Sequence, residues 1–591
     1  MNSRLIDDLL ARVLHVNLSD RTFRIERREE LFLKYLGGTG VALHLLKEEM
    51  NPGVDPLSPD NVVVMAIGVL TGVYPAASKM VAMFKSPLTG NLGESHAGGR
   101  AAIALRMAGF GALVIKGVSE TPIYLSIHDG RVEFKDASAL WGVRSTLTIG
   151  KVLREREPWP GLRSVMRIGR AGERRVRYAS VVLETYRHFG RLGLGAVWGS
   201  KKLKALVVGG RRAVPVADPR SYREVYREIF EECLRNPATR KYHELGTAEN
   251  VLPLNAIGAL PTRNLRSSSF EEAERISGES FASSSLARRV ACSHCPIACI
   301  HIASIREQYP GEKYFYVTRY ISYDYEPIYA LGSMLGVGEM EGVLKLIEQA
   351  DTLGLDAISS GVALAWTTEA FERGILSEKD TLVKPNWGDW RTYAKMLELI
   401  VEQPNDFYEH LAKGTEEAAK TYGGLDFALT FGGNEMPGYH TGPGAHVGYL
   451  IGLRHSHLDN AGYSVDQKYL GKPYPDPRGL VNELVNEESW RQTLTSLVLC
   501  LFVRGIYTPS LISRALKPIG IELSEEELKE IGKKIYAEKL ELKRAMGFDP
   551  LKLRVPKRIT ETESPHGTVD EEYVRNALIY YSSRISSSGE L

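Results

Sequence analysis

The sequence predicts an α+β protein in which a β-rich N-terminal domain is followed by two mainly helical domains. Three observations support this. The 591 residues are about four times the length of an average domain. Up to about residue 210 the chain is rich in glycine and in short apolar runs. From Asp218 onward, apolar residues recur at helical spacing. We place the domain boundaries at residues 1–212, 213–425 and 426–591.

The composition is that of an ordinary globular protein. Lys and Arg number 74 against 72 Asp and Glu, so the net charge is +2, and 43% of the residues are hydrophobic. This balance does not point to nucleic acid as a partner. No window reaches about 18 consecutive apolar residues, and charges are scattered through the N-terminus. We therefore expect neither export nor a membrane span, and we place the protein in the cytoplasm.

The N-terminal domain is expected to consist of strands and tight turns. Apolar runs predict strands at 61–67 and 112–115. Two further runs, 122–127 and 131–134, flank the sequence His128-Asp129-Gly130, which is typical of a β-hairpin turn. We find no internal repeat in the sequence.

The rest of the chain is expected to be mainly helical. Pro215, Asp218 and Pro219 precede a helix over 221–234. Ser524 and Glu527 form a capping-box pattern at the start of the last predicted helix. Helical spacing predicts further helices at 337–352, 358–373, 407–421, 487–503, 507–516 and 524–545.

Three of the five cysteines form a compact array, Cys292-x2-Cys295-x3-Cys299. Three thiolates this close can hold three corners of one metal centre, and a distant cysteine commonly supplies the fourth ligand. Cys233 and Cys500 are the two candidates. A zinc site is the alternative, but the paired C-x2-C spacing of zinc knuckles is absent. We therefore favour an iron–sulfur cluster in a reducing compartment.

The cysteine array together with Asp351-x-x-Gly354-Leu355-Asp356 resembles the tungsten-containing aldehyde:ferredoxin oxidoreductase family, whose D-x-x-G-L-D motif binds a pterin. The family fold implies that the β-rich domain forms a base for the cofactor, and that the helical domains close over it. The resemblance covers nearly the whole chain and includes residues 37–40, 56–59, 85–90 and 195–201.

The resemblance implies a set of cofactor-binding residues. The Asp351 carboxylate can accept hydrogen bonds from the amino and ring N–H edge of a pterin. Gly354 either lets the backbone approach the ring or simply ends a helix. Arginines near the glycine-rich segment after residue 187 suit the pterin phosphates, which a magnesium ion can bridge. The residues implied are Lys79, His96, Gly98, Arg187, His188, Gly190, Arg191, Asp351, Leu355, Asp356, Thr495 and Leu499.

The second pterin motif of the family, D-x-x-G-L-C, is altered here to Thr495-x-x-Val498-Leu499-Cys500. The cysteine is kept, which makes Cys500 the expected fourth cluster ligand beside Cys292, Cys295 and Cys299. Threonine accepts fewer hydrogen bonds than a carboxylate, so the second pterin must be held differently or less tightly.

Two residues match the active site of the family. Glu326 stands where the family has a glutamate beside the metal, and a solvated loop carboxylate is the alternative interpretation. His457 matches the active-site histidine, and Asp459 replaces a lysine that contacts the cofactor. His440, His446 and His455 lie close by in the sequence, and a metal site on His455-x-His457 is conceivable.

The resemblance implies oxidation of an aldehyde to a carboxylic acid at a tungsten bis-pterin centre, with molybdenum as the alternative metal. Glu326 is the candidate base, and His457 is the candidate donor to the substrate carbonyl. Electrons would leave through a [4Fe–4S] cluster to ferredoxin or to a dedicated iron–sulfur subunit. Two alternatives remain: a reductase of an activated acid, and an electron-transfer protein that has lost pterin binding. The sequence does not indicate an oligomeric state.

Overall fold

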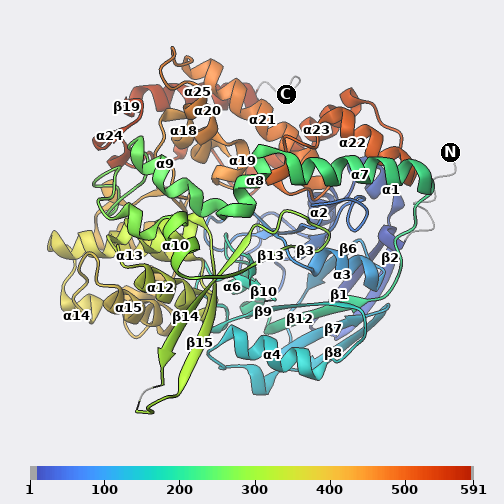
Figure 1. Cartoon of the computed structure of the whole chain (residues 1–591), viewed down its shortest axis with the longest axis horizontal. Coiled ribbons are helices and arrows are strands. Elements are labelled where there is room, and N and C mark those ends of the chain that lie inside the picture. Colours follow the sequence, from blue (N-terminus) through green and yellow to red (C-terminus); the bar gives the residue numbers. More distant parts are fainter. Residues whose placement is uncertain (1–8, 185, 310, 587–591) are drawn as a thin grey trace.

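The computed structural model describes residues 9–184, 186–309 and 311–586. The predicted α+β class is confirmed, because a sheet-rich N-terminal part precedes helical parts (Figure 1). The first sheet has the strand order β2-β1-β6-β3-β4-β5. Its strands are β1 (Arg12–Asn17), β2 (Thr22–Arg27), β3 (Val63–Ala66), β4 (Met80–Lys85), β5 (Leu92–Ala97) and β6 (Ala112–Lys116).

The second sheet has six strands in the order β8-β7-β12-β9-β10-β11. The Asp129-Gly130 turn joins the first two strands with positive φ at both residues (47° and 86°), so the predicted hairpin is confirmed. The strands are β7 (Ile123–His128), β8 (Arg131–Asp136), β9 (Leu162–Ile168), β10 (Val181–Leu183), β11 (Arg187–Phe189) and β12 (Leu203–Gly210).

The two sheets repeat one topology. In each, the first strand pairs antiparallel with the second and parallel with the sixth, and the third to sixth strands pair antiparallel in the same order. The fold therefore repeats a unit, although the sequence shows no internal repeat. Strand order and burial repeat here rather than a residue motif, since β2 and β8 are both largely exposed whereas β1 and β7 are buried.

Helices pack on both sheets. α2 begins at Gly38, which lies beside the segment that follows β3, and contacts β3 and β4. The helices of this part are α1 (Glu29–Tyr35), α2 (Gly38–Glu49), α3 (Ala101–Ala108), α4 (Thr146–Arg156), α5 (Arg170–Glu173) and α6 (Leu194–Ser200).

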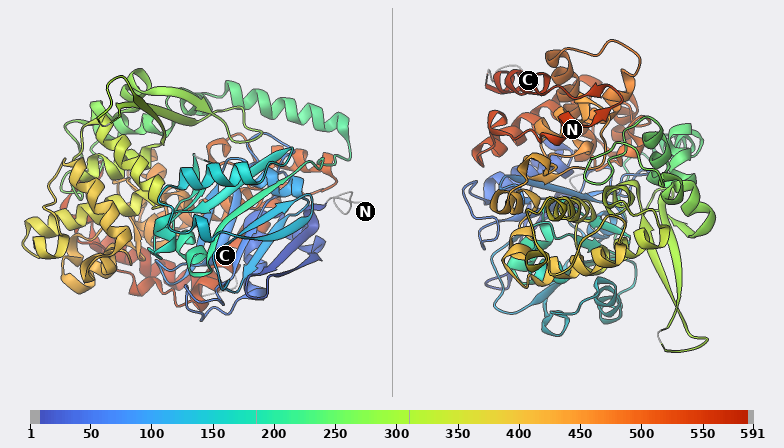
Figure 2. Two further views of the ribbon diagram at one scale, coloured as in Figure 1. Left: turned by 90° about the horizontal axis from the view of Figure 1, so that it is seen from below. Right: turned by 90° about the vertical axis from the view of Figure 1, so that its left-hand side faces the viewer.

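The middle part contains a three-stranded antiparallel sheet that the sequence analysis did not predict. Its strands are β13 (Leu286–Val290), β14 (Ile300–Gln308) and β15 (Tyr316–Tyr323). In the right-hand view of Figure 2, β14 and β15 project from the body as a long hairpin. The helices around this sheet are α7 (Pro219–Arg235), α8 (Pro237–Glu244), α9 (Val251–Ala256), α10 (Gly278–Ser284), α11 (Tyr325–Leu331), α12 (Met340–Leu353) and α13 (Ala357–Glu372).

One predicted helix of the middle part is two helices. The prediction was a single helix over 407–421, but α16 (Asp406–Leu411) and α17 (Thr415–Tyr422) are separated at Gly414, whose φ of 121° no right-handed helix allows. Two more helices precede them, α14 (Glu378–Thr381) and α15 (Trp390–Glu402).

The last part is helical, and Ser524 forms the predicted capping box at the start of α23. The predicted helix over 487–503 was wrong at both ends, because α21 begins at Pro477 behind the cap Asp476 and stops at Ser496. The main helices are α18 (Pro443–Ile451), α19 (His457–Asn460), α20 (Gly462–Lys468), α21 (Pro477–Ser496), α22 (Pro509–Leu516), α23 (Glu525–Ala545) and α25 (Glu571–Ser586).

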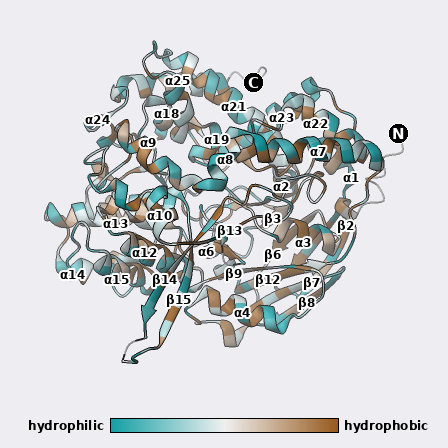
Figure 3. Cartoon of the chain, in the orientation of Figure 1, coloured by the Kyte–Doolittle hydropathy of each residue, from teal (hydrophilic) through white to brown (hydrophobic). Residues whose placement is uncertain are grey.

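The core of the N-terminal part is completed from the far end of the chain. Leu494 and Leu497 at the end of α21, and Ile535 and Leu542 of α23, pack with the first sheet and α2. The sixth strands of the two sheets, β6 and β12, are mainly hydrophobic (Figure 3). Among the described residues, no helix combines the length and apolar character that a membrane crossing requires. The domain boundaries stay a prediction.

Candidate active site

The cysteine array forms a tightly turned loop between β13 and β14. His294 and Ala298 have left-handed backbone conformations (φ 57° and 52°), and the Cys295 N–H donates to the Cys292 carbonyl at 3.1 Å. The His294 carbonyl in turn accepts the Ala76 N–H at 3.0 Å. The loop is thereby fastened to the segment that leads into β4.

Cys500 meets this loop from the end of α21. Its N–H donates to the Ala76 carbonyl at 3.0 Å, so one residue of the N-terminal part bonds to both cysteine-bearing loops. Cys500 interacts electrostatically with Cys295 and Cys299. Cys233 lies on α7 among apolar residues of the N-terminal core, and burial raises the pKa of its thiol to about 12. The structure therefore brings Cys500 to the array.

The four thiols suit an anionic iron–sulfur cluster. In the part of the chain that the structure describes, no three His, Cys, Asp or Glu side chains converge as ligands of a single ion. A [4Fe–4S] cluster makes a different demand, because each thiolate binds its own iron. Positive charge lies beside the thiols: burial alone would lower the pKa of Lys79, but Cys500 and Cys292 raise it.

Arg187 and His188 on β11 link the cluster loop to the first pterin motif. Arg187 pairs with Asp324 at 3.1 Å and also interacts with Cys292. His188 Nε2 lies 3.1 Å from Asp351 Oδ1. The Arg187 Nε is buried and has no hydrogen-bond partner among the described residues. A buried guanidinium with a free N–H suits a phosphate.

Arg191 extends this cationic segment beyond Gly190. Its Nε donates to Asp356 at 3.2 Å and its Nη2 to the Glu435 carbonyl at 2.7 Å, while Nη1 is buried without a partner in the described part of the chain. Asp356 also caps α13 by accepting the Ile358 N–H at 3.0 Å. Leu355 forms an isolated antiparallel β-bridge with Ala179, just before β10. Asp356 and Leu355 thus have structural contacts of their own.

Gly354 ends helix α12 in a left-handed conformation with φ of 78°. A Cβ at this position would lie 2.8 Å from the Gly169 backbone nitrogen. The interpretation of Gly354 as a helix-ending glycine is therefore confirmed, and its approach to a pterin stays a prediction.

Lys79, His96 and Gly98 form a second group, where β4 begins and β5 ends in the first sheet. His96 lies on β5, and its Nε2 is 2.6 Å from Glu94 Oε1. A Cβ on Gly98 would lie 2.8 Å from Cys292 Sγ and 3.2 Å from Lys79 Nζ. Glycine is required here for the close approach of β5 to the cluster loop.

Thr495 and Leu499 lie at the end of α21, next to this second group. The Thr495 hydroxyl donates to the Gln492 carbonyl within its own helix, at 3.2 Å. The Leu499 N–H donates back to Leu494 at 2.9 Å, which closes the helix end. Val498 has a φ of 53°, a left-handed conformation that is strained for a β-branched residue.

Glu326 and His457 are brought together from α11 and α19. His457 Nε2 lies 3.2 Å from Glu326 Oε1, and both side chains are mostly buried. Burial alone would raise the pKa of the Glu326 carboxyl, but the hydrogen bond and charge of His457 hold it below its ordinary value. His457 Nδ1 is buried and has no partner among the described residues.

Sequence reasoning missed Tyr439, a third member of this pair. Its hydroxyl donates to Glu326 Oε1 at 2.9 Å, and its ring stacks on Tyr463 with centroids 4.5 Å apart. In the sequence, the stretch that contains Tyr439 is distinguished only by its histidines. Glycines on either side of it, Gly438 and Gly442, were the available signal for a specially shaped loop.

The other three histidines of the cluster are packing residues. His440 Nδ1 and His446 Nε2 lie 2.9 Å apart, and His455 lies between the Tyr449 carbonyl and Lys543. Burial lowers the pKa of His455 to about 3. The described residues form no metal site on His455-x-His457.

Asp459 is buried and engaged within its own loop. It accepts the Arg454 Nε at 2.5 Å and the Ser456 N–H at 3.0 Å, which completes a capping box at α19. Where the family has a lysine, this chain therefore has a buried carboxylate, Asp459, which is paired with the cation Arg454.

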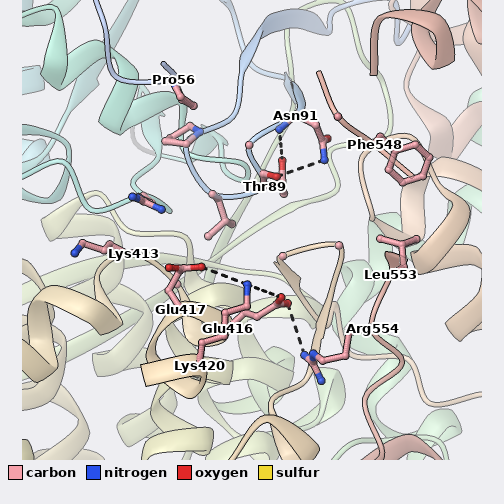
Figure 4. Close-up of a pocket in the computed structure, with 18 of the residues that line it drawn as sticks. Pro56, Thr89, Asn91, Lys413, Glu416, Glu417, Lys420, Phe548, Leu553 and Arg554 are labelled. Atoms are coloured by element: carbon pink, nitrogen blue, oxygen red, sulfur yellow. Dashed lines mark hydrogen bonds and ion pairs between the residues drawn. The ribbon is translucent and has the colours of Figure 1, made fainter. Parts of the chain in front are cut away.

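A cavity of about 520 Å³ opens where the three parts of the chain meet (Figure 4). Its walls come from residues 55–57, 87–91, 413–420, 432–433 and 547–554. Glu416 in this wall forms ion pairs with Lys420 at 3.1 Å and with Arg554 at 3.7 Å. None of the site residues predicted from the sequence lines this cavity.

Two models of one protein family match most of the chain. The family model described as the N-terminal domain of aldehyde ferredoxin oxidoreductase matches residues 13–210. The model described as domains 2 and 3 of aldehyde ferredoxin oxidoreductase matches residues 224–584.

Several known proteins are similar to this chain, and the first two named here match over nearly their full length. The tungsten-containing aldehyde ferredoxin oxidoreductase of Thermococcus kodakarensis is 34% identical over 95% of this chain and 93% of its own length. That of Pyrococcus furiosus is 33% identical over 94% of this chain and 92% of its own. The aliphatic sulfonate oxidoreductase WOR-like subunit of Pyrococcus furiosus is 31% identical over 69% of this chain and 66% of its own.

A solved structure shares the fold. The active-site complex of benzoyl coenzyme A reductase with 1,5-dienoyl-CoA superimposes with a TM-score of 0.81, covering 98% of this chain and 94% of that chain. The sequence identity is 21%, so this likeness concerns the fold alone.

Proposed function

The chain belongs to the aldehyde ferredoxin oxidoreductase family, and we propose that it oxidises an aldehyde to a carboxylic acid at a tungsten bis-pterin centre. The aldehyde and one water yield the acid, two electrons and two protons. The electrons leave through a [4Fe–4S] cluster on Cys292, Cys295, Cys299 and Cys500 to ferredoxin or to a dedicated iron–sulfur subunit. The observation that supports the proposal best is the buried pair of Glu326 and His457.

The pair lies next to the residues proposed to hold the cofactors. Glu326 is two residues from Asp324, which pairs with Arg187 at the edge of the cysteine loop. His188, the residue after Arg187, faces Asp351. When bound, the tungsten–pterin group supplies the two-electron oxidation. We expect tungsten rather than molybdenum, a magnesium ion between the pterin phosphates, and a cytoplasmic location.

The chain itself handles the protons. The lowered pKa of Glu326 keeps it ionised at neutral pH, so it can accept a proton from the attacking water. Tyr439 donates to the same oxygen and keeps the carboxylate oriented. Because Nε2–H is directed to Glu326, a His457 ring that carries both protons has its free Nδ1–H available to donate to the substrate carbonyl.

The substitution Glu326→Gln tests this role. It is nearly isosteric, and we expect kcat to fall by roughly 10²–10⁴ with tungsten and iron still bound. The acid limb of the pH–rate profile should disappear, because that limb reports protonation of Glu326. Glu339→Gln, at an exposed helix cap that bonds to Trp390, is the matched control and should leave kcat unchanged. Undiminished turnover in a fully loaded Glu326→Gln protein contradicts the proposal.

A further inference from the structure

The two N-terminal sheets place two histidines at equivalent positions. His96 lies opposite Val81 in the β4–β5 pair, and His188 lies opposite Val182 in the β10–β11 pair. These strand pairs correspond in the repeated topology. Gly98 and Gly190 follow the two histidines at the same distance.

The two halves differ in the helix end that accompanies each histidine. His188 faces the end of α12, where Asp351 supplies a carboxylate at 3.1 Å. His96 belongs to the half that contacts the end of α21, where the corresponding residue is Thr495. Because the Thr495 hydroxyl donates to its own helix, it has no proton to offer a ligand and is a weak acceptor. The second helix end therefore lacks the charged acceptor of the first.

A carboxylate reaches the second half by another route. Glu94 lies two residues before His96 on β5, so both side chains point to the same face of the sheet. Glu94 Oε1 lies 2.6 Å from His96 Nε2, and it also accepts from Thr39 at 3.4 Å. Thr39 lies between Gly38 and Gly40, which contact the backbone of Thr495 and the hydroxyl of Ser496. Glu94 is thus beside the altered motif.

Lys539 of α23 keeps Glu94 ionised in this buried place. Lys539 pairs with Glu94 Oε2, and both side chains are 1% exposed. Lys539 also donates to Gln492 Oε1 at 2.9 Å, one turn before Thr495. Burial alone would raise the pKa of Glu94, but Lys539 and His96 hold it well below its usual range. A charged acceptor is therefore available at neutral pH.

We propose that the Glu94–His96 pair is the recognition site for the second pterin and replaces the carboxylate that the Thr495 position has lost. This inference rests on the proposed function, because it requires one pterin in each half. The amino and ring N–H groups of a pterin edge need acceptors. His96, whose side chain is 14% exposed, supplies a ring nitrogen, and the buried Glu94 carboxylate at its Nε2 orients the ring and places negative charge behind it. In the first half, Asp351 and His188 form the corresponding pair.

The test is a rescue experiment read out by pterin per tungsten after anaerobic purification. The double variant Glu94→Gln/Lys539→Met removes the charge that orients His96 without leaving an unpaired buried lysine. We expect its pterin content per tungsten to fall to about half of the wild-type value. Adding Thr495→Asp should restore the ratio, because the carboxylate returns at the helix end. A purely structural role for Glu94 predicts no rescue by Thr495→Asp.

Controls separate the possible failures. Glu483→Gln/Lys468→Met removes an exposed pair of similar chemistry and should leave the ratio unchanged. His96→Ala leaves the Glu94–Lys539 pair intact and should lower the ratio even if the double variant does not fold. A wild-type protein without tungsten and pterin contradicts the proposed function itself. A wild-type protein with two pterins, and variants that keep both, contradict this inference alone.

Discussion

The ends of helices α12 and α21 have the same backbone architecture and different side chains. Leu355 and Leu499 each donate an N–H to the carbonyl five residues earlier, both at 2.9 Å. Gly354 and Val498 each accept an N–H from the N-terminal part, from Ser180 at 2.8 Å and from Lys79 at 3.2 Å. The next hydrogen bond also corresponds, since Asp356 and Cys500 donate to Tyr178 and Ala76, both at 3.0 Å.

The difference shows that docking to the sheets, rather than the local residue, determines the shape of these helix ends. Gly354 adopts its φ of 78° without steric cost. Val498 is held at 53° although a β-branched residue disfavours it. The backbone of the second site is therefore retained, while its ligand chemistry has moved from residue 495 to the strand that carries Glu94 and His96.

The largest expected effect is on the first helix end. Gly354→Val combines a left-handed φ with a Cβ only 2.8 Å from the Gly169 nitrogen, so we expect a loss of about 2–4 kcal/mol of stability. Denaturant unfolding followed by circular dichroism measures this. Gly374→Val separates strain from clash, since Gly374 has a φ of 70° and open space around it. Equal losses in the two variants would show that close contact at Gly354 does not matter.

The next effect distinguishes the acceptors of the two motifs. Asp351→Asn should reduce tungsten retention about tenfold or more, because a charged hydrogen-bond acceptor is lost. Thr495→Val should change retention less than about twofold, because the hydroxyl bonds only to its own helix. Tungsten per chain is the measurement, and iron per chain reports an intact cluster. Comparable losses in both variants would break the proposed asymmetry.

A smaller effect concerns acid pH and belongs to the second half alone. The pKa of Glu94 is lower in the folded chain than in the unfolded one. Its ionisation therefore stabilises the fold at pH values above the pKa that Glu94 has in the unfolded chain. That contribution is lost as the pH falls below about 4.5. Unfolding measured across this range should show a steeper acid loss for wild type than for Glu94→Gln/Lys539→Met. Parallel curves would mean that Glu94 has an unperturbed pKa.

The smallest effect measures the strain at Val498. Val498→Gly relieves the left-handed backbone while losing a buried side chain, and Val503→Gly loses a side chain that is equally buried at 0% exposure. Val498→Gly should therefore cost about 1–2 kcal/mol less than Val503→Gly. Equal costs in denaturant unfolding would show that Val498 is unstrained.

Features with a local signal could be predicted from the sequence. The capping box at Ser524 and the Asp129-Gly130 hairpin were predicted where they occur. The end of α21 was not, because the glycine that usually marks a helix end is Val498 here, and apolar residues continue to Phe502. The β13–β15 sheet was also missed, since β13 is a short, mostly exposed strand without an apolar run.

Contacts between distant residues left no such signal. Glu94 and Lys539 are far apart in the sequence, and neither the strand nor the helix that carries them shows an unusual pattern. Tyr439 reaches Glu326 from another part of the chain in the same way. The sequence indicated the first pterin motif and the cysteine array because each is compact, and it could only show that the second motif was altered.

The central claim is that both halves of the N-terminal part hold a pterin, despite the altered helix end at Thr495. Extraction of the cofactor from anaerobically purified wild-type protein, with tungsten and iron measured on the same sample, tests it most directly. We predict two pterins and one tungsten per chain, with the iron of one [4Fe–4S] cluster. One pterin per tungsten would contradict the claim, because it would show that the Glu94–His96 pair does not replace the lost carboxylate.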